Sequence, residues 1–172
     1  MPDTRDTLWT IGHSTRTAGE FVDLLQAHGI TRLVDVRRFA GSRAHPQFNP
    51  PALERSLGRA GIAYTPMPAL GGRRTPLPDS PHTAWRNAAF RGYADYMDTP
   101  AFAAAAARLG RLARRDRVAI MCAEAVWWRC HRSMIADWFK ANGWEVLHIM
   151  GMGDAREHPY TPVARDRVDG AR

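Results

Sequence analysis

The sequence predicts an α/β domain, a three-layer doubly wound sheet of about five mainly parallel strands with helices on both faces. Short apolar runs alternate with segments of helical period along the whole chain, which is the pattern of a parallel sheet. The length of 172 residues fits one domain with one core. With 45% hydrophobic and 24% charged residues, the composition excludes collagen, coiled coil and disorder. We assign residues 1–150 to a single α/β domain and 151–172 to a polar C-terminal tail.

The first strand is predicted over 8–11, where Leu-Trp-Thr-Ile precedes Gly12. A T-x-x-E capping box, formed by Thr17 and Glu20, starts the helix that follows. Gly29 comes where a left-handed residue ends a helix. The second strand is predicted over 33–36.

Asn49, followed by two prolines, predicts the start of a second helix with a side-chain acceptor at its N-cap. Gly61 ends this helix, and a third strand is predicted over 62–67. The next segment, 68–86, is rich in Pro and Gly and is too long for a simple connection. We therefore expect it to be a lid or a binding loop.

The rest of the domain continues the alternation, with Gly143 ending the last helix. The predicted elements are a short helix over 90–97, an Ala-rich helix from Thr99 to about Arg114, a strand over 118–122, a helix over about 130–142 and a strand over 145–150. Right-handed crossovers then give an expected strand order of 3-2-1-4-5.

The formal net charge is +7 and the sequence pI is about 10.4, which suits a nucleic acid or an anionic small molecule as partner. The excess lies in residues 61–120, which hold nine Arg against four Asp. No signal segment and no apolar run of membrane length is visible, so we expect a soluble, cytoplasmic protein without a membrane partner. Two cysteines are too few for a disulfide scaffold and are expected as reduced thiols.

In a doubly wound sheet, ligands bind at the carboxyl ends of the strands, where the strand order reverses. In the expected order this point lies between the first and fourth strands. Reactive side chains follow three predicted strands, namely His13 and Ser14, Asp35 and Arg37, and Cys122 and Glu124. Further on, Arg129, His131 and Arg132 lie at the start of a helix, where free N–H groups and the helix dipole favour an anion.

These residues predict an anion-binding pocket at the carboxyl edge of the sheet, in a protein that we expect to be an enzyme. We assign catalytic roles to His13, Glu124 and Cys122, with His13 or Glu124 as acid or base. Guanidinium groups bind phosphate or carboxylate through paired hydrogen bonds. The expected ligand-binding residues are Ser14, Asp35, Arg37, Gly71, Gly72, Arg73, Arg129, His131 and Arg132. The alternative is that these arginines pair internally with Asp35 and Glu124.

Several stretches together resemble the family known as domain of unknown function 488. They are TIGHSTRTAGEFVDLLQAHGI, LVDVRRFAGSRAHPQFNP, LGGRR, WRNAAFRGYADYM and MCAEAVWWRCHRSMIADW. The resemblance covers residues 9 to about 150. It implies an α/β fold and directs attention to the candidate residues above and to Cys130, but it implies no reaction.

Three alternatives stay open beside the anion pocket. A cysteine-phosphatase or rhodanese arrangement is disfavoured, because six residues without glycine separate Cys122 from Arg129 and Glu124 would raise the thiol pKa. Cys130, at the helix start, is electrostatically better placed.

A metal-dependent enzyme would need His, Cys and Glu ligands from separate strands, since no close ligand spacing is present, and no residue is assigned to a metal. A nucleic-acid-binding module without catalysis would use Arg73, Arg74, Arg86 and Arg91. Trp85, Phe90, Tyr93 and Tyr96 lie among them and could stack on bases.

Overall fold

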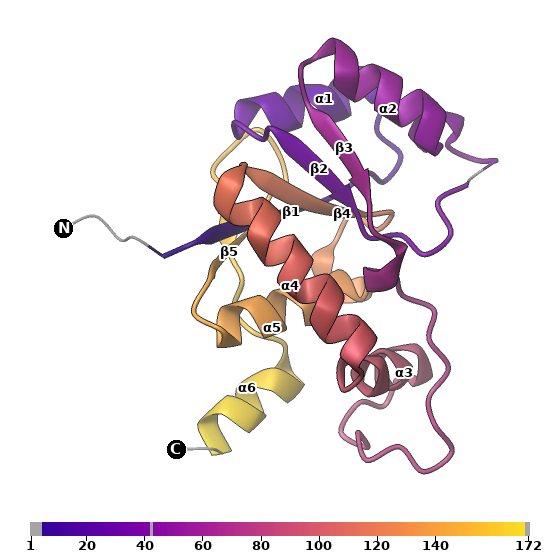
Figure 1. Ribbon diagram of the computed structural model, residues 1–172, viewed down its shortest axis with the longest axis vertical. Helices are drawn as coiled ribbons and strands as arrows, with labels where there is room; N and C mark the ends of the chain where they lie inside the picture. The colour runs from indigo at the N-terminus through magenta and orange to yellow at the C-terminus, as the bar shows by residue number, and fades with distance from the viewer. Residues whose placement is uncertain (1–4, 42, 171–172) are drawn as a thin grey trace.

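The computed structural model describes residues 5–41 and 43–170, the side chains of 167–170 excepted. It confirms the three-layer α/β fold, with helices packed on both faces of a mostly parallel sheet (Figure 1). The strands are β1 (Thr7–Gly12), β2 (Arg32–Asp35), β3 (Ala63–Pro66), β4 (Val118–Cys122), β5 (Glu145–His148) and β6 (Arg156–Glu157). Only β6 runs antiparallel to its neighbour.

The sheet order is β3-β2-β4-β1-β5-β6, so the expected order 3-2-1-4-5 is wrong in one respect. β4 lies between β1 and β2, where the expectation placed β1 directly beside β2. All residues of β4 are buried, and a strand that is apolar on both faces is best covered at the centre of a sheet. β1 and β4 still pair with each other, and the connections that leave them run in opposite directions.

The helices are α1 (Ala18–Ala27), α2 (Pro50–Arg59), α3 (Ala88–Met97), α4 (Pro100–Arg115), α5 (Arg132–Ala141) and α6 (Pro162–Gly170). Three short 3-10 helices are η1 (Pro46–Phe48), η2 (Pro68–Leu70) and η3 (Trp127–Arg129). α1 and α2 cover one face of the sheet with Phe21, Leu25 and Leu53. α3, α4 and α5 cover the other face with a separate apolar cluster (Figure 1).

The predicted helix ends are largely confirmed. Thr17 and Glu20 form both hydrogen bonds of the capping box. Gly29, Gly61 and Gly143 have positive φ angles, the backbone conformation that favours glycine. Asn49 is the N-cap of α2 but makes no side-chain capping bond, unlike the prediction, so the two prolines with their fixed φ carry this helix start.

The segment from Gly151 onward adds β6 and α6 to the predicted elements. His158 and Thr161 in this segment are buried. Both donate to the carboxylate of Asp137 on α5, His158 through Nε2 at 2.7 Å and Thr161 through Oγ1 at 2.6 Å. These buried hydrogen bonds to Asp137 attach the segment to the domain, although the segment has few apolar residues.

Across the described ranges 5–41 and 43–170, no helix is long and apolar enough to cross a membrane.

One glycine is required by a close approach of two chain segments. A Cβ atom built on Gly12, the last residue of β1, would lie 1.7 Å from the carbonyl oxygen of Glu124 and 3.0 Å from Cα of Ala125. Both atoms belong to the backbone, so neither can move aside alone. The loop after β4 can therefore fold over the end of β1 only because residue 12 has no side chain.

Gly12→Ala is expected to destabilise the protein by about 1–3 kcal/mol or more, as overpacking in a rigid site does. The midpoint of urea unfolding measures this. Gly58→Ala is the matched control, because Gly58 lies within α2 with nothing near its Cβ position, and there alanine should stabilise by about 0.5–1 kcal/mol. Equal stability of Gly12→Ala and the wild type would contradict the close approach.

Candidate functional site

A cavity of about 270 Å³ opens at the carboxyl ends of β2 and β4. Its walls come from four places, namely the turn after β2, the loop after η2, the first turns of α3 and the connection between β4 and α5. The lining residues are Arg37, Arg38, Phe39, Gly72, Arg73, Ala89, Phe90, Tyr93, Cys122, Ala123, Glu124, Arg129, Cys130 and His131. The loop that was expected to be a lid thus lies at the carboxyl edge of the sheet.

Strand pairing positions the cavity. β2 pairs with β4, so that Asp35 lies beside Met121 and the residues after these strands emerge side by side. Pairing with β1 extends past the strand ends, because the N–H groups of His13 and Ser14 donate to the carbonyls of Cys122 and Ala123 at 3.0 and 2.9 Å.

Two cysteines, the buried Cys122 and the half-buried Cys130, form part of the wall of the cavity. Cys122 ends β4, Cys130 precedes α5, and their Sγ atoms lie 2.7 Å apart. The backbone N–H of Arg132 also donates to Sγ of Cys130 at 3.3 Å. The sequence analysis considered both cysteines, but their spacing along the chain did not predict that their sulfur atoms are in contact.

Arg132 is wholly buried and does not line the cavity. It donates to Oγ1 of Thr10 at 2.8 Å and to the carbonyls of Glu124 at 3.0 Å and Ala125 at 3.4 Å. Its Nε has no hydrogen-bond partner in the described part of the chain, nor does it form an ion pair with a carboxylate there. Arg132 therefore supplies an unneutralised positive charge directly behind the two thiols.

This charge and the contact between the thiols separate the two cysteine pKa values. Burial opposes ionisation of Cys122, but the hydrogen bond with Cys130 and the Arg132 charge outweigh it and bring the pKa to about 7. Burial and the neighbouring Cys122 raise the pKa of Cys130 well above its ordinary value. The predicted rise of the thiol pKa by the Glu124 carboxylate is not found, because the contact between the two residues runs from Sγ of Cys122 to the backbone carbonyl of Glu124 at 3.7 Å.

Arg37 is held in place by Asp35. Nε and Nη2 of Arg37 donate to the two carboxylate oxygens of Asp35 at 2.9 and 2.6 Å, and Nη2 also donates to the Phe48 carbonyl. Tyr64 donates to the same carboxylate at 2.6 Å. The internal pairing considered from the sequence thus exists for Arg37, which nevertheless lines the cavity.

His13 lies behind Arg37, outside the cavity. Its ring stacks on Phe48 at 4.4 Å, and its Nδ1 donates to the Ser14 carbonyl at 2.9 Å. Nε2 is then an acceptor and faces Nη1 of Arg37 at 3.4 Å. Burial is the main cause that lowers the pKa of His13. Because His13 contacts Arg37 and is not among the lining residues, it is connected to the cavity through Arg37.

His131 is neutral and oriented by the sheet. Its Nε2 donates to the Val36 carbonyl at 2.8 Å, and a Cβ at Gly72 would lie 2.7 Å from its Nδ1. Burial, together with the charges of Arg132 and Arg74, lowers the His131 pKa to about 4. Gly71 is also closely packed, with a Cβ position 2.5 Å from Cα of Arg38, so both glycines seat the loop on the sheet.

Exposed charges surround the mouth of the cavity. Arg38, Arg73, Glu124 and Arg129 are all exposed. Nη1 of Arg38 donates to the Arg73 carbonyl at 2.9 Å, and both guanidinium groups lie over the ring of Phe39. Within residues 5–41 and 43–170, nothing forms a hydrogen bond or an ion pair with the Arg129 side chain.

The structure brings most of the predicted residues together. Those that line the cavity are Arg37, Gly72, Arg73, Cys122, Glu124, Arg129 and His131. Those that support it from outside are His13, Ser14, Asp35, Gly71 and Arg132. Sequence reasoning missed Arg38 and Phe39 in the cavity wall, although their position directly after Arg37 at a strand end was a usable signal.

Of the four aromatic residues considered for base stacking, one lies in the core and three are partly buried against it. Tyr93 is buried and donates to the Leu70 carbonyl, and Arg74 covers Tyr96 at 3.7 Å. Trp85 and Phe90 pack against the core on the α4 side. In the described residues, no three His, Cys, Asp or Glu side chains form a group that could hold a metal ion.

A buried hydrogen-bond chain runs from Arg132 to Asp137. When His158 is in its neutral form and donates Nε2–H to Asp137, its Nδ1 accepts Nε2–H of His148 at 2.8 Å. Nδ1 of His148 then accepts from Oγ1 of Thr10 at 2.6 Å, and Thr10 accepts from Arg132. Every proton in this chain points from the cation toward the carboxylate.

These features define an α/β protein with an arginine-rich cavity and a pair of neighbouring thiols at the carboxyl edge of its sheet. A sequence model of the family described as "Domain of unknown function DUF488" matches residues 17–139. The chain belongs to this family, as its sequence motifs predicted. Comparison with curated proteins and with solved structures gives no match.

The neutral buried histidines make stability depend on pH. Burial, with the nearby His158 and Arg132, lowers the pKa of His148 to about 2, and that of His131 is about 4. Because both folded-state values lie below the unfolded value of about 6.5, only the unfolded chain takes up these protons as the pH falls from 6.5. Stability should therefore drop by about 1.4 kcal/mol per pH unit for each such histidine between about pH 6 and pH 5.

Urea unfolding at a series of pH values measures this slope. His148→Gln should reduce it by about 1.4 kcal/mol per pH unit, since the amide keeps a donor and an acceptor but binds no proton. An unchanged slope in this variant would show that His148 is not held neutral.

Proposed function

We propose that this protein is an enzyme that binds a phosphate- or carboxylate-bearing small molecule in the cavity at the carboxyl edge of the sheet. The observation that carries this proposal is the charge of the cavity wall. Four arginines, Arg37, Arg38, Arg73 and Arg129, face a single carboxylate, Glu124. Guanidinium groups are the side chains that best match the geometry of these anions.

The internal contacts of the four arginines decide which of them bind the anion. Asp35 already neutralises Arg37, so this side chain serves mainly as a fixed wall. Arg38 and Arg73 keep free donors after their contacts with each other and with Phe39. Arg129, for which no partner is described, is the strongest anion ligand, and it directly precedes Cys130.

Two groups in the cavity can do chemistry on a bound anion. Cys122, with a pKa of about 7, is a nucleophile at neutral pH. The exposed carboxylate of Glu124 can accept or return a proton. His13 is a positioning residue in this proposal, because it contacts Arg37 rather than the cavity.

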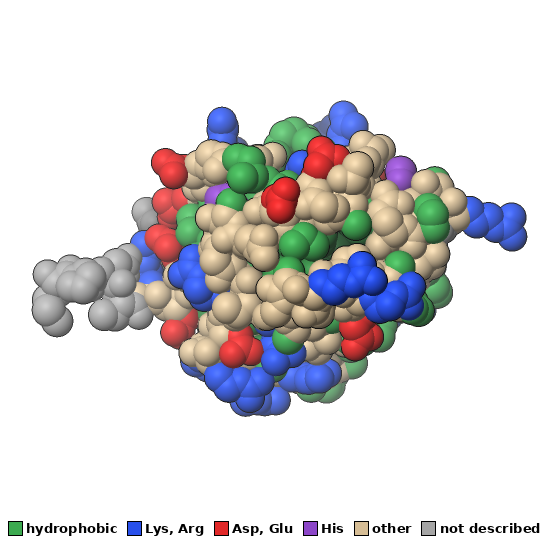
Figure 2. Space-filling view, turned by 90° about the horizontal axis from the view of Figure 1, so that it is seen from above, with side chains coloured by type: hydrophobic (Ala, Val, Ile, Leu, Met, Phe, Trp, Pro, Cys, Tyr) green, Lys and Arg blue, Asp and Glu red, His purple; other side chains and the backbone are tan. Residues whose placement is uncertain are grey.

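Binding of a small molecule explains more of the site than binding of nucleic acid. Arg91 donates to the backbone at Trp85 and Arg86, and Arg74 packs on Tyr96, so half of the arginines expected to contact nucleic acid have internal roles. On the face that Figure 2 shows, basic side chains form separate groups with acidic ones between them. The excess charge thus gives no continuous basic track on this face.

The test is stabilisation of the folded protein by inorganic phosphate. A ligand that binds only the folded state, present at 100 times its Kd, stabilises that state by about 2.7 kcal/mol. For a chain of this size we expect a rise in melting temperature of about 5–10 °C. Arg129→Met should remove most of this rise without lowering the melting temperature in chloride, because the side chain is exposed.

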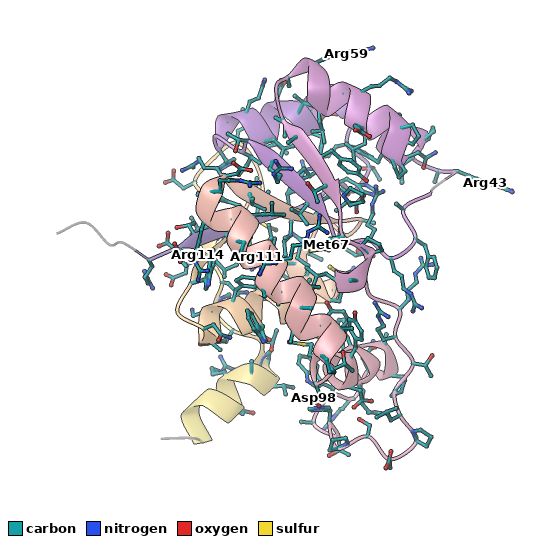
Figure 3. The ribbon with its side chains drawn as sticks, viewed as in Figure 1. Arg43, Arg59, Met67, Asp98, Arg111 and Arg114 are labelled. Atoms are coloured by element: carbon teal, nitrogen blue, oxygen red, sulfur yellow. The ribbon has the colours of Figure 1, made fainter. Side chains whose placement is uncertain are left out.

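Arg59→Met is the matched control. Arg59 lies at the end of α2 and points away from the molecule (Figure 3), so its loss should leave the phosphate effect unchanged. Sodium chloride at the same ionic strength controls for screening. Equal phosphate stabilisation of the Arg129→Met variant and the wild type would reject the assignment of the anion to this cavity.

A further inference from the structure

The chain has two thiols, the buried Cys122 and the half-buried Cys130. Anion binding alone does not explain why the second lies beside the first. Their Sγ atoms are in contact at 2.7 Å, although seven residues separate them in sequence. A disulfide requires sulfur atoms at about 2.05 Å. The two sulfur atoms therefore lie close enough for a disulfide to join them after a small approach.

The surroundings favour a thiolate at this place. Arg132 is a buried cation whose Nε has no hydrogen-bond partner in the described residues. Its other nitrogens bind a hydroxyl and two carbonyls, none of which carries a compensating charge. A thiolate on Cys122 is attracted to this cation and supplies a compensating negative charge, and it does so only in the reduced, ionised state.

The two thiols are also unequal, as an exchange reaction requires. Cys122 has the lower pKa, about 7, and Cys130 has one well above its ordinary value. Cys122 is thus the attacking sulfur, and Cys130 remains protonated until its neighbour has reacted. With Cys122 only 2% exposed, access is through the cavity, whose volume of about 270 Å³ admits a small molecule.

We infer that Cys122 and Cys130 form a dithiol–disulfide couple, and that the cavity carries out thiol–disulfide exchange on a small disulfide bearing a carboxylate or phosphate group. The charge of this substrate rests on the proposed function. The couple itself rests on the contact between the two sulfurs and on the buried cation behind them.

The exchange balances in two steps. The Cys122 thiolate attacks one sulfur of the substrate, forms a mixed disulfide and releases the other half of the substrate as a thiolate. Cys130 then attacks the Cys122 sulfur, gives its proton to a leaving thiolate and releases the second half. Two electrons pass from the protein to the substrate disulfide, which leaves as one thiol and one thiolate, and the protein keeps a Cys122–Cys130 disulfide.

The experiment uses dithiobis-nitrobenzoate, a disulfide with a carboxylate on each half, and the neutral disulfide dithiodipyridine. The full-length reduced protein should release two coloured thiols per chain and finish as a monomer with a Cys122–Cys130 disulfide, seen by peptide mass mapping. Cys130→Ser should release one thiol and keep the mixed disulfide on Cys122. Cys122→Ser should react more slowly than the wild type by a factor of about ten or more, because the remaining thiol is protonated.

Two stable adducts on the wild-type chain, or cross-linked dimers in place of the internal disulfide, would overturn the couple. So would equally fast reaction of Cys122→Ser and the wild type. Arg129→Met separates the two proposals. If the anion pocket is correct, this variant reacts about tenfold more slowly with the anionic disulfide and equally fast with the neutral one. If its rate is unchanged with both while the internal disulfide still forms, the proposed function fails and the couple stands.

Discussion

The buried guanidinium of Arg132 is the constraint on which the site depends. A cation in a protein interior is costly unless hydrogen bonds replace its lost water. Here Thr10 on β1 and the carbonyls of Glu124 and Ala125 supply these bonds. They tie the start of α5 to β1 and to the loop after β4, which crosses the end of β1 over Gly12. The positions of Cys122 and Glu124 follow from this crossing.

Hydrogen bonds connect Arg132 to a distant carboxylate without an ion pair between them. The hydrogen-bond chain through Thr10, His148 and His158 leads to Asp137, a second residue of α5. The ring of Trp127 stacks on the ring of His148, with the centroids 4.7 Å apart, and covers one side of this series of hydrogen bonds. Because His158 belongs to the C-terminal segment, this polar network attaches that segment to the domain where few apolar contacts are available.

The place of β4 in the sheet decides which residues meet. With β4 next to β2, Arg37 at the end of one strand lies beside Cys122 at the end of the other. In the order 3-2-1-4-5, β1 would separate these strands and His13 would lie between their ends. In the structure His13 lies behind Arg37 instead, so the cavity combines guanidinium groups with thiols, and its imidazole is that of His131 and not that of His13.

The sequence by itself determined the α/β class, most helix and strand positions and the edge of the sheet where the candidate residues gather. These follow from local patterns, such as the capping box at Thr17 and the apolar run of 118–122. Tertiary structure alone decided the strand order, the contact between Cys122 and Cys130, and the burial of Arg132. Each of these depends on which segments pack against each other across the sheet, and spacing along the chain carries no record of that.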